Sequence, residues 1–140
     1  MMTLEDAYKN LKVLVIDDED AMRKLIGRRL ERLGVTTIVE AHDGASGFQQ
    51  VLNTRPDIVL CDVHMQPVGG YEFLRLVRES DIDWVRATPV IFLSGDNLLD
   101  TVRRATRLHV DAYMVKPMGR DDLKTQLDIM ITRLAERDSK

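Results

Sequence analysis

Short apolar stretches alternate along the chain with segments whose apolar residues recur at helical spacing. The stretches rich in β-branched and apolar residues are typical of buried strands, and they cover residues 11–16, 35–41, 57–61, 90–93 and 112–115. Each is followed by a helix-like pattern, within residues 22–33, 48–52, 71–77, 98–108 and 123–134. Strands that alternate with helices in this way predict a doubly wound α/β fold, a parallel sheet with helices on both faces.

The same spacing predicts which side chains form one face of each helix. The last helix has the clearest stripe, formed by Leu123, Leu127, Met130, Ile131 and Leu134. The corresponding positions in the first two helices are Met22, Leu25, Ile26, Leu30 and Leu33, followed by Gly34 as a cap, and then Phe48, Val51 and Leu52. Trp84, between the third helix and the fourth strand, is expected to be a local anchor.

The composition fits one domain over residues 1–140, with a core over about 10–137. With 44% apolar and 31% charged residues, the chain can bury a core. A net charge of -3, with both signs scattered, argues against direct nucleic-acid binding.

The longest uncharged stretch, Gly44–Thr54, is too polar and short to span a bilayer, and the N-terminus resembles no secretory leader, so a cytoplasmic protein is expected. The lone Cys61 excludes an internal disulfide and predicts a buried, inert thiol.

Polar residues stand at the ends of the predicted strands, where open α/β sheets bind ligands. If the strand order is 2-1-3-4-5, the first and third strands are neighbours, and Asp17, Asp18 and Asp62 converge. Crowded carboxylates are relieved by a raised pKa or by a hard divalent cation, and Mg²⁺ fits such a set of oxygens. Ser94 and Lys116 end the fourth and fifth strands, where they could bind a phosphoryl group carried by a carboxylate.

Each of these residues also has an ordinary structural interpretation. Asp18, Glu19 and Asp20 could cap the first helix, which is the usual role of acids at a helix start. Tyr113 could be a half-buried strand aromatic, and Arg103, Arg104 and Arg107 a solvated helix face. No histidine is assigned as a ligand by its side chain. The joint placement of Asp62, Ser94 and Lys116 at strand ends favours a site.

The chain resembles the receiver domains of bacterial two-component response regulators, which have a flavodoxin-like (βα)5 fold. The resemblance extends over nearly all of the sequence and rests on five motifs in order: VLVIDDE (13–19), DIVLCDVHM (57–65), Gly70, VIFLSG (90–95) and AYMVKP (112–117). It implies that Asp62 is the phosphoacceptor, that Asp18 binds Mg²⁺ directly and that Asp17 acts largely through water. Mn²⁺ is an expected substitute, and the backbone carbonyl of His64 completes the implied ligands.

The resemblance also assigns the switch. Ser94 and Lys116 would bind the phosphoryl group, and Tyr113 would be the aromatic residue that turns inward when Ser94 moves. Lys116-Pro117 is a candidate cis peptide. The sequence departs from the family pattern at Pro67, which is one position late, and His64 and Asp96 occupy places that tune the phosphoryl lifetime in the family.

The implied function is a single-domain response regulator, not an enzyme beyond its own phosphorylation and dephosphorylation. The donor would be a sensor histidine kinase or a histidine phosphotransfer protein, with small acyl phosphates as substitutes. The implied output surface for a protein partner or a homodimer lies on the fourth helix, fifth strand and fifth helix. The residues after the last helix, 136–140, are too few for an effector domain. Chemotaxis or motility, a phosphorelay and stress signalling fit equally well.

Three other functions are less well supported by the sequence. An aspartate-nucleophile phosphatase of the haloacid dehalogenase type uses similar groups, but it needs a D-x-D motif after the first strand and a cap segment; the strand here ends in Asp17-Asp18-Glu19-Asp20. A receiver-like module that works without phosphorylation is favoured only by the displaced Pro67. A dinucleotide-binding domain lacks its G-x-G-x-x-G motif after the first strand.

Overall fold

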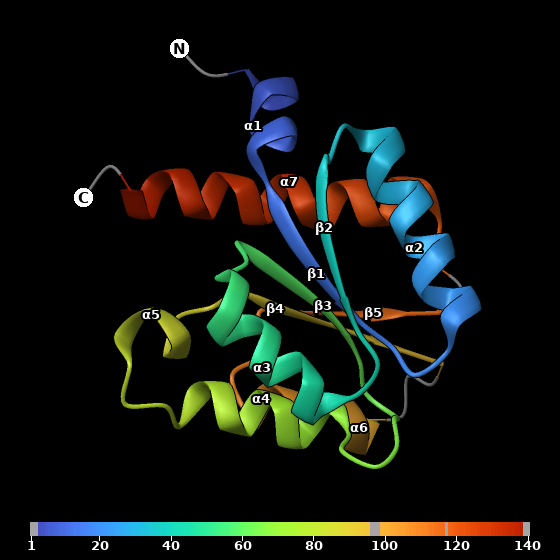
Figure 1. Ribbon diagram of the computed structural model, residues 1–140, viewed down its shortest axis with the longest axis vertical. Helices are drawn as coiled ribbons and strands as arrows, with labels where there is room; N and C mark the ends of the chain where they lie inside the picture. The colour runs from blue at the N-terminus through green and yellow to red at the C-terminus, as the bar shows by residue number, and fades with distance from the viewer. Residues whose placement is uncertain (1–2, 96–98, 117, 139–140) are drawn as a thin grey trace.

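The computed structural model describes residues 3–95, 99–116 and 118–138, and it contains one parallel five-stranded sheet (Figure 1). The strand order β2-β1-β3-β4-β5 is the predicted one. The strands are β1 (Lys12–Ile16), β2 (Thr37–Ala41), β3 (Ile58–Asp62), β4 (Val90–Ser94) and β5 (Ala112–Val115). The doubly wound α/β fold is therefore confirmed.

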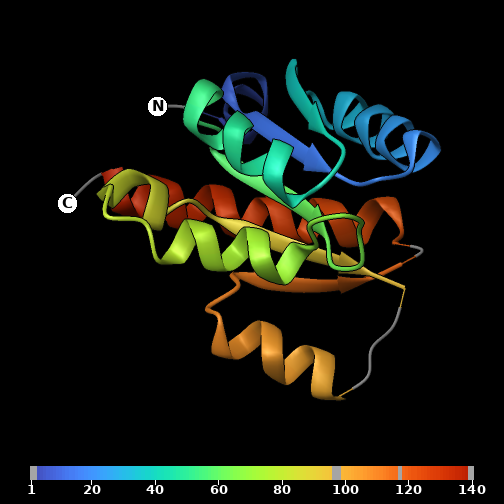
Figure 2. The same cartoon turned by 60° about the horizontal axis from the view of Figure 1, so that its bottom comes forward.

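Helices cover both faces of the sheet (Figure 2). One face packs against α1 (Leu4–Asn10), α2 (Asp20–Leu33) and α7 (Arg120–Asp138). The other packs against α3 (Gly44–Thr54), α4 (Gly70–Arg78), α5 (Asp83–Arg86) and α6 (Leu99–Arg107). Alternate residues of β1 serve the two cores, because successive strand side chains point to opposite faces: Val13 and Val15 face α2 and α7, whereas Leu14 and Ile16 face α3 and α4.

Seven helices in the described residues replace the five that were predicted. The two helices that were not predicted are α1 and α5, and α5 has only four residues. At the start of α1, the Thr3 hydroxyl accepts from the Asp6 backbone N–H, and the Asp6 carboxylate accepts from the Thr3 N–H. Such a capping box satisfies two backbone donors that a helix start leaves without partners.

Two side chains assigned to helix faces lie largely outside the core. Leu25 on α2 is 39% exposed and Leu52 on α3 is 38% exposed. Each lies beside a better-buried neighbour, Ile26 or Val51, that takes the central position against the sheet. The predicted face was one residue too wide in each helix. None of the described helices is long and apolar enough to cross a membrane.

Strand pairing brings the carboxyl ends of four strands together. Ile16 pairs with Cys61, Asp62 pairs with Leu93, and Ser94 pairs with Val115. Because parallel strands in register end at one edge of the sheet, the residues that follow or end β1, β3, β4 and β5 are neighbours in space. The polar residues predicted at these ends therefore lie together at one edge of the sheet.

Candidate functional site

Three carboxylates meet at the carboxyl edge of the sheet. Asp17 and Asp18 follow β1, and Asp62 is the last residue of β3. One oxygen from each of them lies within 4.8 Å of the others. Asp17 and Asp62 are buried, whereas Asp18 is exposed. The convergence predicted from the strand order is therefore observed, with one carboxylate of the three open to solvent.

Lys116 supplies the positive charge beside this cluster. Its Nζ lies 2.9 Å from Asp17 Oδ2 and 3.5 Å from Asp62 Oδ1. The Lys116 backbone N–H donates to the carbonyl of Ser94, which fixes the chain directly after β5. Burial lowers the pKa of Lys116, but the hydrogen bond to Asp17 and the charge of Asp62 outweigh it, so the net shift is upward. The ammonium group therefore remains charged at neutral pH.

The environment of Asp62 disfavours its negative charge. Burial raises the pKa of Asp62 above its ordinary value; Lys116 opposes this rise and the charge of Asp17 adds to it. The backbone N–H of His64 donates to Asp62 Oδ1 over 3.4 Å, a long bond. Lys116 and this weak donor do not fully offset the cost of burying the charge of Asp62, which suits a site that takes up a cation.

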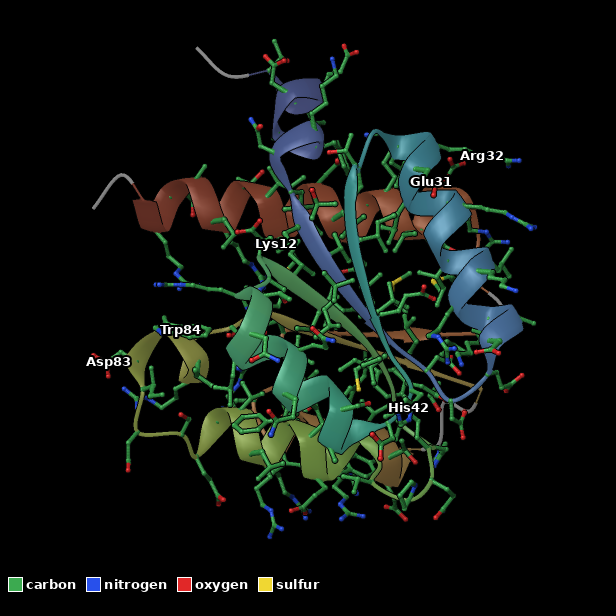
Figure 3. The ribbon with its side chains drawn as sticks, in the orientation of Figure 1. Lys12, Glu31, Arg32, His42, Asp83 and Trp84 are labelled. Atoms are coloured by element: carbon green, nitrogen blue, oxygen red, sulfur yellow. The ribbon has the colours of Figure 1, made fainter. Side chains whose placement is uncertain are left out.

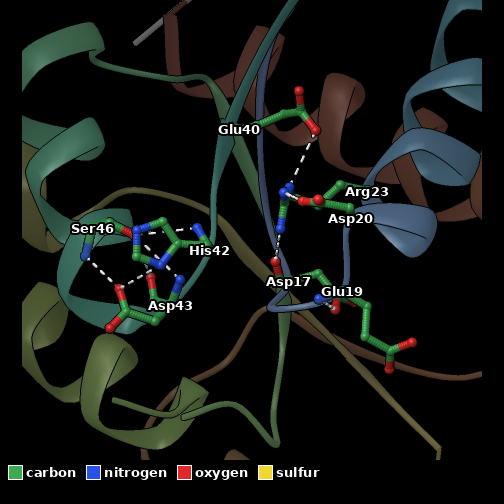
Figure 4. Close-up of polar contacts among 8 residues, drawn as sticks. All are labelled: Asp17, Glu19, Asp20, Arg23, Glu40, His42, Asp43 and Ser46. Atoms are coloured by element: carbon green, nitrogen blue, oxygen red, sulfur yellow. Dashed lines mark hydrogen bonds and ion pairs between the residues drawn. The ribbon is translucent and has the colours of Figure 1, made fainter. Parts of the chain in front are cut away.

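Asp17 is held more firmly than Asp62. Its Oδ1 accepts from the Glu19 backbone N–H at 2.9 Å and its Oδ2 accepts from Lys116. Arg23 donates to the Asp17 carbonyl at 2.5 Å and to Glu40 Oε1 at 3.3 Å, and it also pairs with Asp20 (Figure 4). Arg23 was not predicted at this edge, because its one signal in the sequence is its spacing of three residues from Asp20.

The capping interpretation of the acids after β1 is correct only in part, because Asp20 lies in the first turn of α2, where an acid complements the helix dipole. Glu19 occupies the N-cap position of α2, and its side chain makes no capping hydrogen bond. Asp20 lies inside the first turn, where its carboxylate pairs with Arg23. Asp18 is directed to the acidic cluster rather than to the helix backbone.

The loop after β3 approaches Asp62 closely. The Gly70 N–H donates to the Val63 carbonyl, and a Cβ at position 70 would overlap the carbonyl oxygen of Asp62. Only glycine fits at position 70 without displacing the Asp62 backbone. The Gln66-Pro67 peptide at the displaced proline is cis. The predicted cis bond at Lys116-Pro117, and Asp96, lie outside the described residues.

The two residues assigned to the switch lie on neighbouring strands, Ser94 on β4 and Tyr113 on β5. Ser94 is fully buried as the last residue of β4, between the ends of β3 and β5. Tyr113 is half-buried on β5, where it pairs with Phe92 of β4. His64, the implied carbonyl ligand, has an exposed side chain beside Asp62.

Arg104 is not simply a solvated arginine. Its Cζ lies 4.1 Å from the centre of the Tyr71 ring, a cation–π contact between α6 and α4. The Tyr71 hydroxyl donates to the Thr101 carbonyl at 3.3 Å, and its ring packs edge-on against Phe92 at 5.8 Å. The sequence offered no spacing signal for this link, because its members come from separate elements.

Cys61 lies directly beneath the acidic cluster and should be unreactive. The thiol is fully buried, and burial together with the charges of Asp62 and Asp17 raises its pKa well above the ordinary value. We expect a disulfide reagent at pH 8 to modify native protein at least about a thousandfold more slowly than protein in denaturant, because the thiolate is the reacting form. Similar absorbance-monitored rates in both conditions would contradict this prediction.

The fold and the position of these residues define a flavodoxin-like α/β domain with an acidic site at the carboxyl edge of its sheet. The family model of the response regulator receiver domain matches residues 13–128. The chain belongs to this family, whose members are signalling modules of two-component systems.

Some relatives match this chain over nearly their whole length, whereas others are longer proteins that match over only a part. The chain is 35% identical over 124 residues to the transcriptional regulatory protein TrcR of Mycobacterium tuberculosis, a match that spans 88% of this chain and 46% of TrcR. It is 29% identical over 126 residues to the chemotaxis protein CheY-3 of Vibrio cholerae, which spans 90% of this chain and 95% of that protein. Since the match takes in less than half of TrcR, the expectation of a regulator without an effector domain stays a prediction.

Solved structures agree on the fold. The receiver domain of the Francisella response regulator 1452 superimposes with a TM-score of 0.79 at 26% identity, over 89% of this chain and 99% of that chain. The chemotaxis protein CheY4 of Vibrio cholerae gives a TM-score of 0.78 at 24% identity, over 86% and 98%. The likeness to CheY4 supports the fold alone.

Proposed function

We propose that this receiver domain accepts a phosphoryl group on Asp62 in a Mg²⁺-dependent reaction and thereby switches a protein-binding surface. The observation that carries this proposal is the placement of Asp62 beside two further carboxylates and within 3.5 Å of the Lys116 ammonium, which also contacts Asp17. A phosphoryl group adds negative charge at this point, so it needs both a cation held by carboxylates and a nearby fixed positive charge.

The donor set fits Mg²⁺. Oxygen atoms from Asp17, Asp18 and Asp62 lie within 4.8 Å of one another, and Mg²⁺ prefers a few carboxylates together with water and phosphate oxygens. Asp18 is the solvent-exposed member and would bind directly, while Asp17 would act through water; the His64 carbonyl would add a further oxygen. When bound, Mg²⁺ would neutralise charge on the phosphoryl oxygens; Mn²⁺ should substitute.

The transfer itself needs little from the protein beyond position and charge. An Asp62 carboxylate oxygen attacks the phosphorus of a donor phosphohistidine, the phosphorus–nitrogen bond breaks, and its electron pair returns to the imidazole. Lys116, 3.5 Å from Asp62 Oδ1, then pairs with a phosphoryl oxygen, and the buried Ser94 hydroxyl donates to another. A sensor histidine kinase or a histidine phosphotransfer protein is the proposed donor.

The output follows from movement of Ser94 and Tyr113. Bonds from Lys116 and Ser94 to the phosphoryl group would favour an inward Tyr113 and a second packing of α6, β5 and α7, where a protein partner or a second copy binds. A shift from 1:99 to 99:1 needs about 5.5 kcal/mol of differential stabilisation. Two or three charge-assisted hydrogen bonds at roughly 1.5–3 kcal/mol each are of that scale.

A phosphatase that uses Asp17 as its nucleophile is less well supported. Both Asp17 oxygens already accept hydrogen bonds, from the Glu19 N–H and from Lys116. Asp17 is also fully buried. Among the described residues, Asp62 accepts the long bond from the His64 N–H and lies 3.5 Å from the Lys116 ammonium. Asp62 is the carboxylate that can reach a phosphorus atom with less loss of existing bonds.

The test is intact-mass measurement after incubation with acetyl phosphate, with and without Mg²⁺, followed by borohydride reduction and peptide mapping. We expect a gain of one phosphoryl group only with Mg²⁺, located at Asp62. A sample that stays unmodified with acetyl phosphate, and also with a panel of phosphorylated histidine kinases and phosphotransfer proteins, would instead favour a module that works without phosphorylation.

Magnesium should stabilise the fold through the same cluster. At millimolar concentration Mg²⁺ is expected to increase the free energy of unfolding by about 1–3 kcal/mol, because it binds only the folded arrangement. Asp18→Asn should remove this response and raise the stability of the metal-free protein, since one crowded charge is gone. Thermal melts of both proteins check this; a destabilised variant with an unchanged magnesium response would contradict it.

A further inference from the structure

A groove of about 930 Å³ lies at the edge of the sheet opposite the acidic cluster. Its lining includes Leu11, Asp57 and Pro89, which directly precede β1, β3 and β4, so it crosses the starts of these strands. Figure 3 shows Lys12, at the start of β1, and Trp84, on α5, at this edge. The groove therefore shares no residue with the acidic cluster.

Two helices contribute apolar side chains to the groove. Leu4, Ala7 and Leu11 line it from α1 and its C-cap, at a spacing that places them on one helix face. Ile131, Leu134 and Ala135 line it from α7. Leu4 is 43% exposed, so part of this apolar surface faces solvent. The groove residues named on α1 and α7 lie outside residues 13–128, the range matched by the family model.

The α1 wall is fixed in place. The Tyr8 ring is buried in the core, and its hydroxyl donates to Asp128 Oδ1 at 2.5 Å on α7. Lys124, one turn earlier on α7, pairs with the same carboxylate at 2.7 Å. The groove is thus a built surface between two anchored helices, rather than a gap beside a loose end of the chain.

Two arginines and one aspartate line the groove, Arg55, Arg137 and Asp57. Arg55 stacks on the Trp84 ring, with its Cζ 4.6 Å from the ring centre, and Arg137 donates to the Ala87 carbonyl. Within the described residues, neither guanidinium pairs with a carboxylate. The Oδ2 of Asp57 accepts from the Lys12 N–H at 2.8 Å and the carboxylate keeps its negative charge, so the lining carries two positive charges against one negative. The rim can therefore attract negative charge on an incoming partner.

We propose that this groove binds an amphipathic helix of a partner protein that carries acidic residues beside its apolar stripe. An amphipathic helix can pack its apolar stripe against the apolar side chains that α1 and α7 contribute, and the two arginines select the flanking acids. An extended strand would need a free sheet edge, and the edge strands β2 and β5 contribute no lining residue. The occupant is thus distinguished by both shape and charge.

Trp84 reports binding, because it is the single tryptophan of the chain and lines the groove. Two synthetic helical peptides with the same apolar stripe, flanked either by Glu or by Lys, are titrated into the whole chain. The Glu peptide is expected to change Trp84 emission saturably and to bind at least about tenfold more tightly than the Lys peptide. Arg137→Glu should remove that preference.

Arg133→Glu is the matched control, since Arg133 is exposed on α7 and does not line the groove. It should leave the preference unchanged, and circular dichroism checks that both variants fold. The proposal is overturned if neither peptide alters emission up to about 1 mM, if both bind equally, or if Arg133→Glu acts like Arg137→Glu. Sedimentation that finds a dimer without peptide, lost in Arg137→Glu, would assign the groove to a second copy and also overturn it.

Discussion

Asp62→Asn is expected to gain no phosphoryl group under conditions in which the wild-type chain gains one. An amide lacks the anionic oxygen that attacks phosphorus, while the size and shape of the side chain are kept. Lys116 retains its 2.9 Å contact with Asp17, so the site should stay intact in the variant. Intact mass after acetyl phosphate treatment with Mg²⁺ measures the loss.

Asp17→Asn is the informative comparison. Asp17 positions Lys116 and is proposed to act on Mg²⁺ through water, so its loss should slow incorporation about tenfold to a hundredfold without abolishing it. A protein that turns over a phosphate ester, and loses that turnover in Asp17→Asn but not in Asp62→Asn, would instead be the aspartate-nucleophile phosphatase.

Asp62→Asn should also stabilise the metal-free fold at neutral pH. Burial raises the pKa of Asp62, so folding disfavours its ionised form. The stabilisation that a raised carboxyl pKa provides is present at low pH and is lost as the pH rises through the folded-state value. The advantage of the variant over wild type should therefore shrink as the pH falls toward the ordinary pKa of 3.8. Urea unfolding of the variant and the wild type, at neutral pH and near pH 3.8, measures the difference in their free energies of unfolding.

The sheet and its acidic edge could be predicted because their signals are local and strong. Each strand is a short run of β-branched and apolar residues, and only the strand ends moved: β2 begins at Thr37, and Asp62 and Ser94 are the last residues of their strands. Once the strand order is fixed, Asp17 and Asp62 must lie at the carboxyl ends of neighbouring strands. The chemistry at this edge follows from topology more than from any single residue.

The two missed helices carry weaker signals of different kinds. The α5 helix has four residues, too few for a periodic pattern to be detected. The α1 helix did carry one usable signal, the spacing of Thr3 and Asp6 that forms a capping box. Its tertiary anchor, Tyr8 on Asp128, joins residues far apart in sequence and could not be predicted from local spacing. The groove that these helices frame was therefore beyond sequence reasoning.

Arg78 shows most clearly what a sequence cannot indicate. An arginine in the last turn of a helix usually lies in solvent, where it complements the helix dipole. Here its guanidinium is largely buried and donates to the carbonyls of His109 at 3.0 Å, Arg86 at 2.9 Å and Thr88 at 2.7 Å. It also pairs with Asp111 at 2.8 Å, and Asp111 in turn accepts from the Val90 N–H. One side chain thus joins α4, the loop after α5 and the starts of β4 and β5.

Arg78→Ala is expected to reduce the free energy of unfolding by about 2–4 kcal/mol, below the full 3–5 kcal/mol of a buried pair because Asp111 is 31% exposed. The loss arises because three carbonyls and one carboxylate lose their donor together. Arg78→Lys keeps the charge but cannot reproduce the planar fork of donors, so an intermediate loss is expected. Urea unfolding monitored by circular dichroism measures all the variants.

Arg75→Ala is the matched control, because Arg75 lies on the same helix and, among the described residues, pairs with Glu72 in an ion pair whose side chains are 52% and 44% exposed. An exposed pair contributes little, so its loss should cost less than about 0.5 kcal/mol. Phosphoryl incorporation at Asp62 should persist in folded Arg78→Ala, since Arg78 contacts the starts of β4 and β5 rather than their carboxyl ends. If Arg78→Ala is no less stable than Arg75→Ala, the buried guanidinium does not stabilise the contacts among α4, the loop after α5 and the starts of β4 and β5. Apolar packing alone must then hold these elements together.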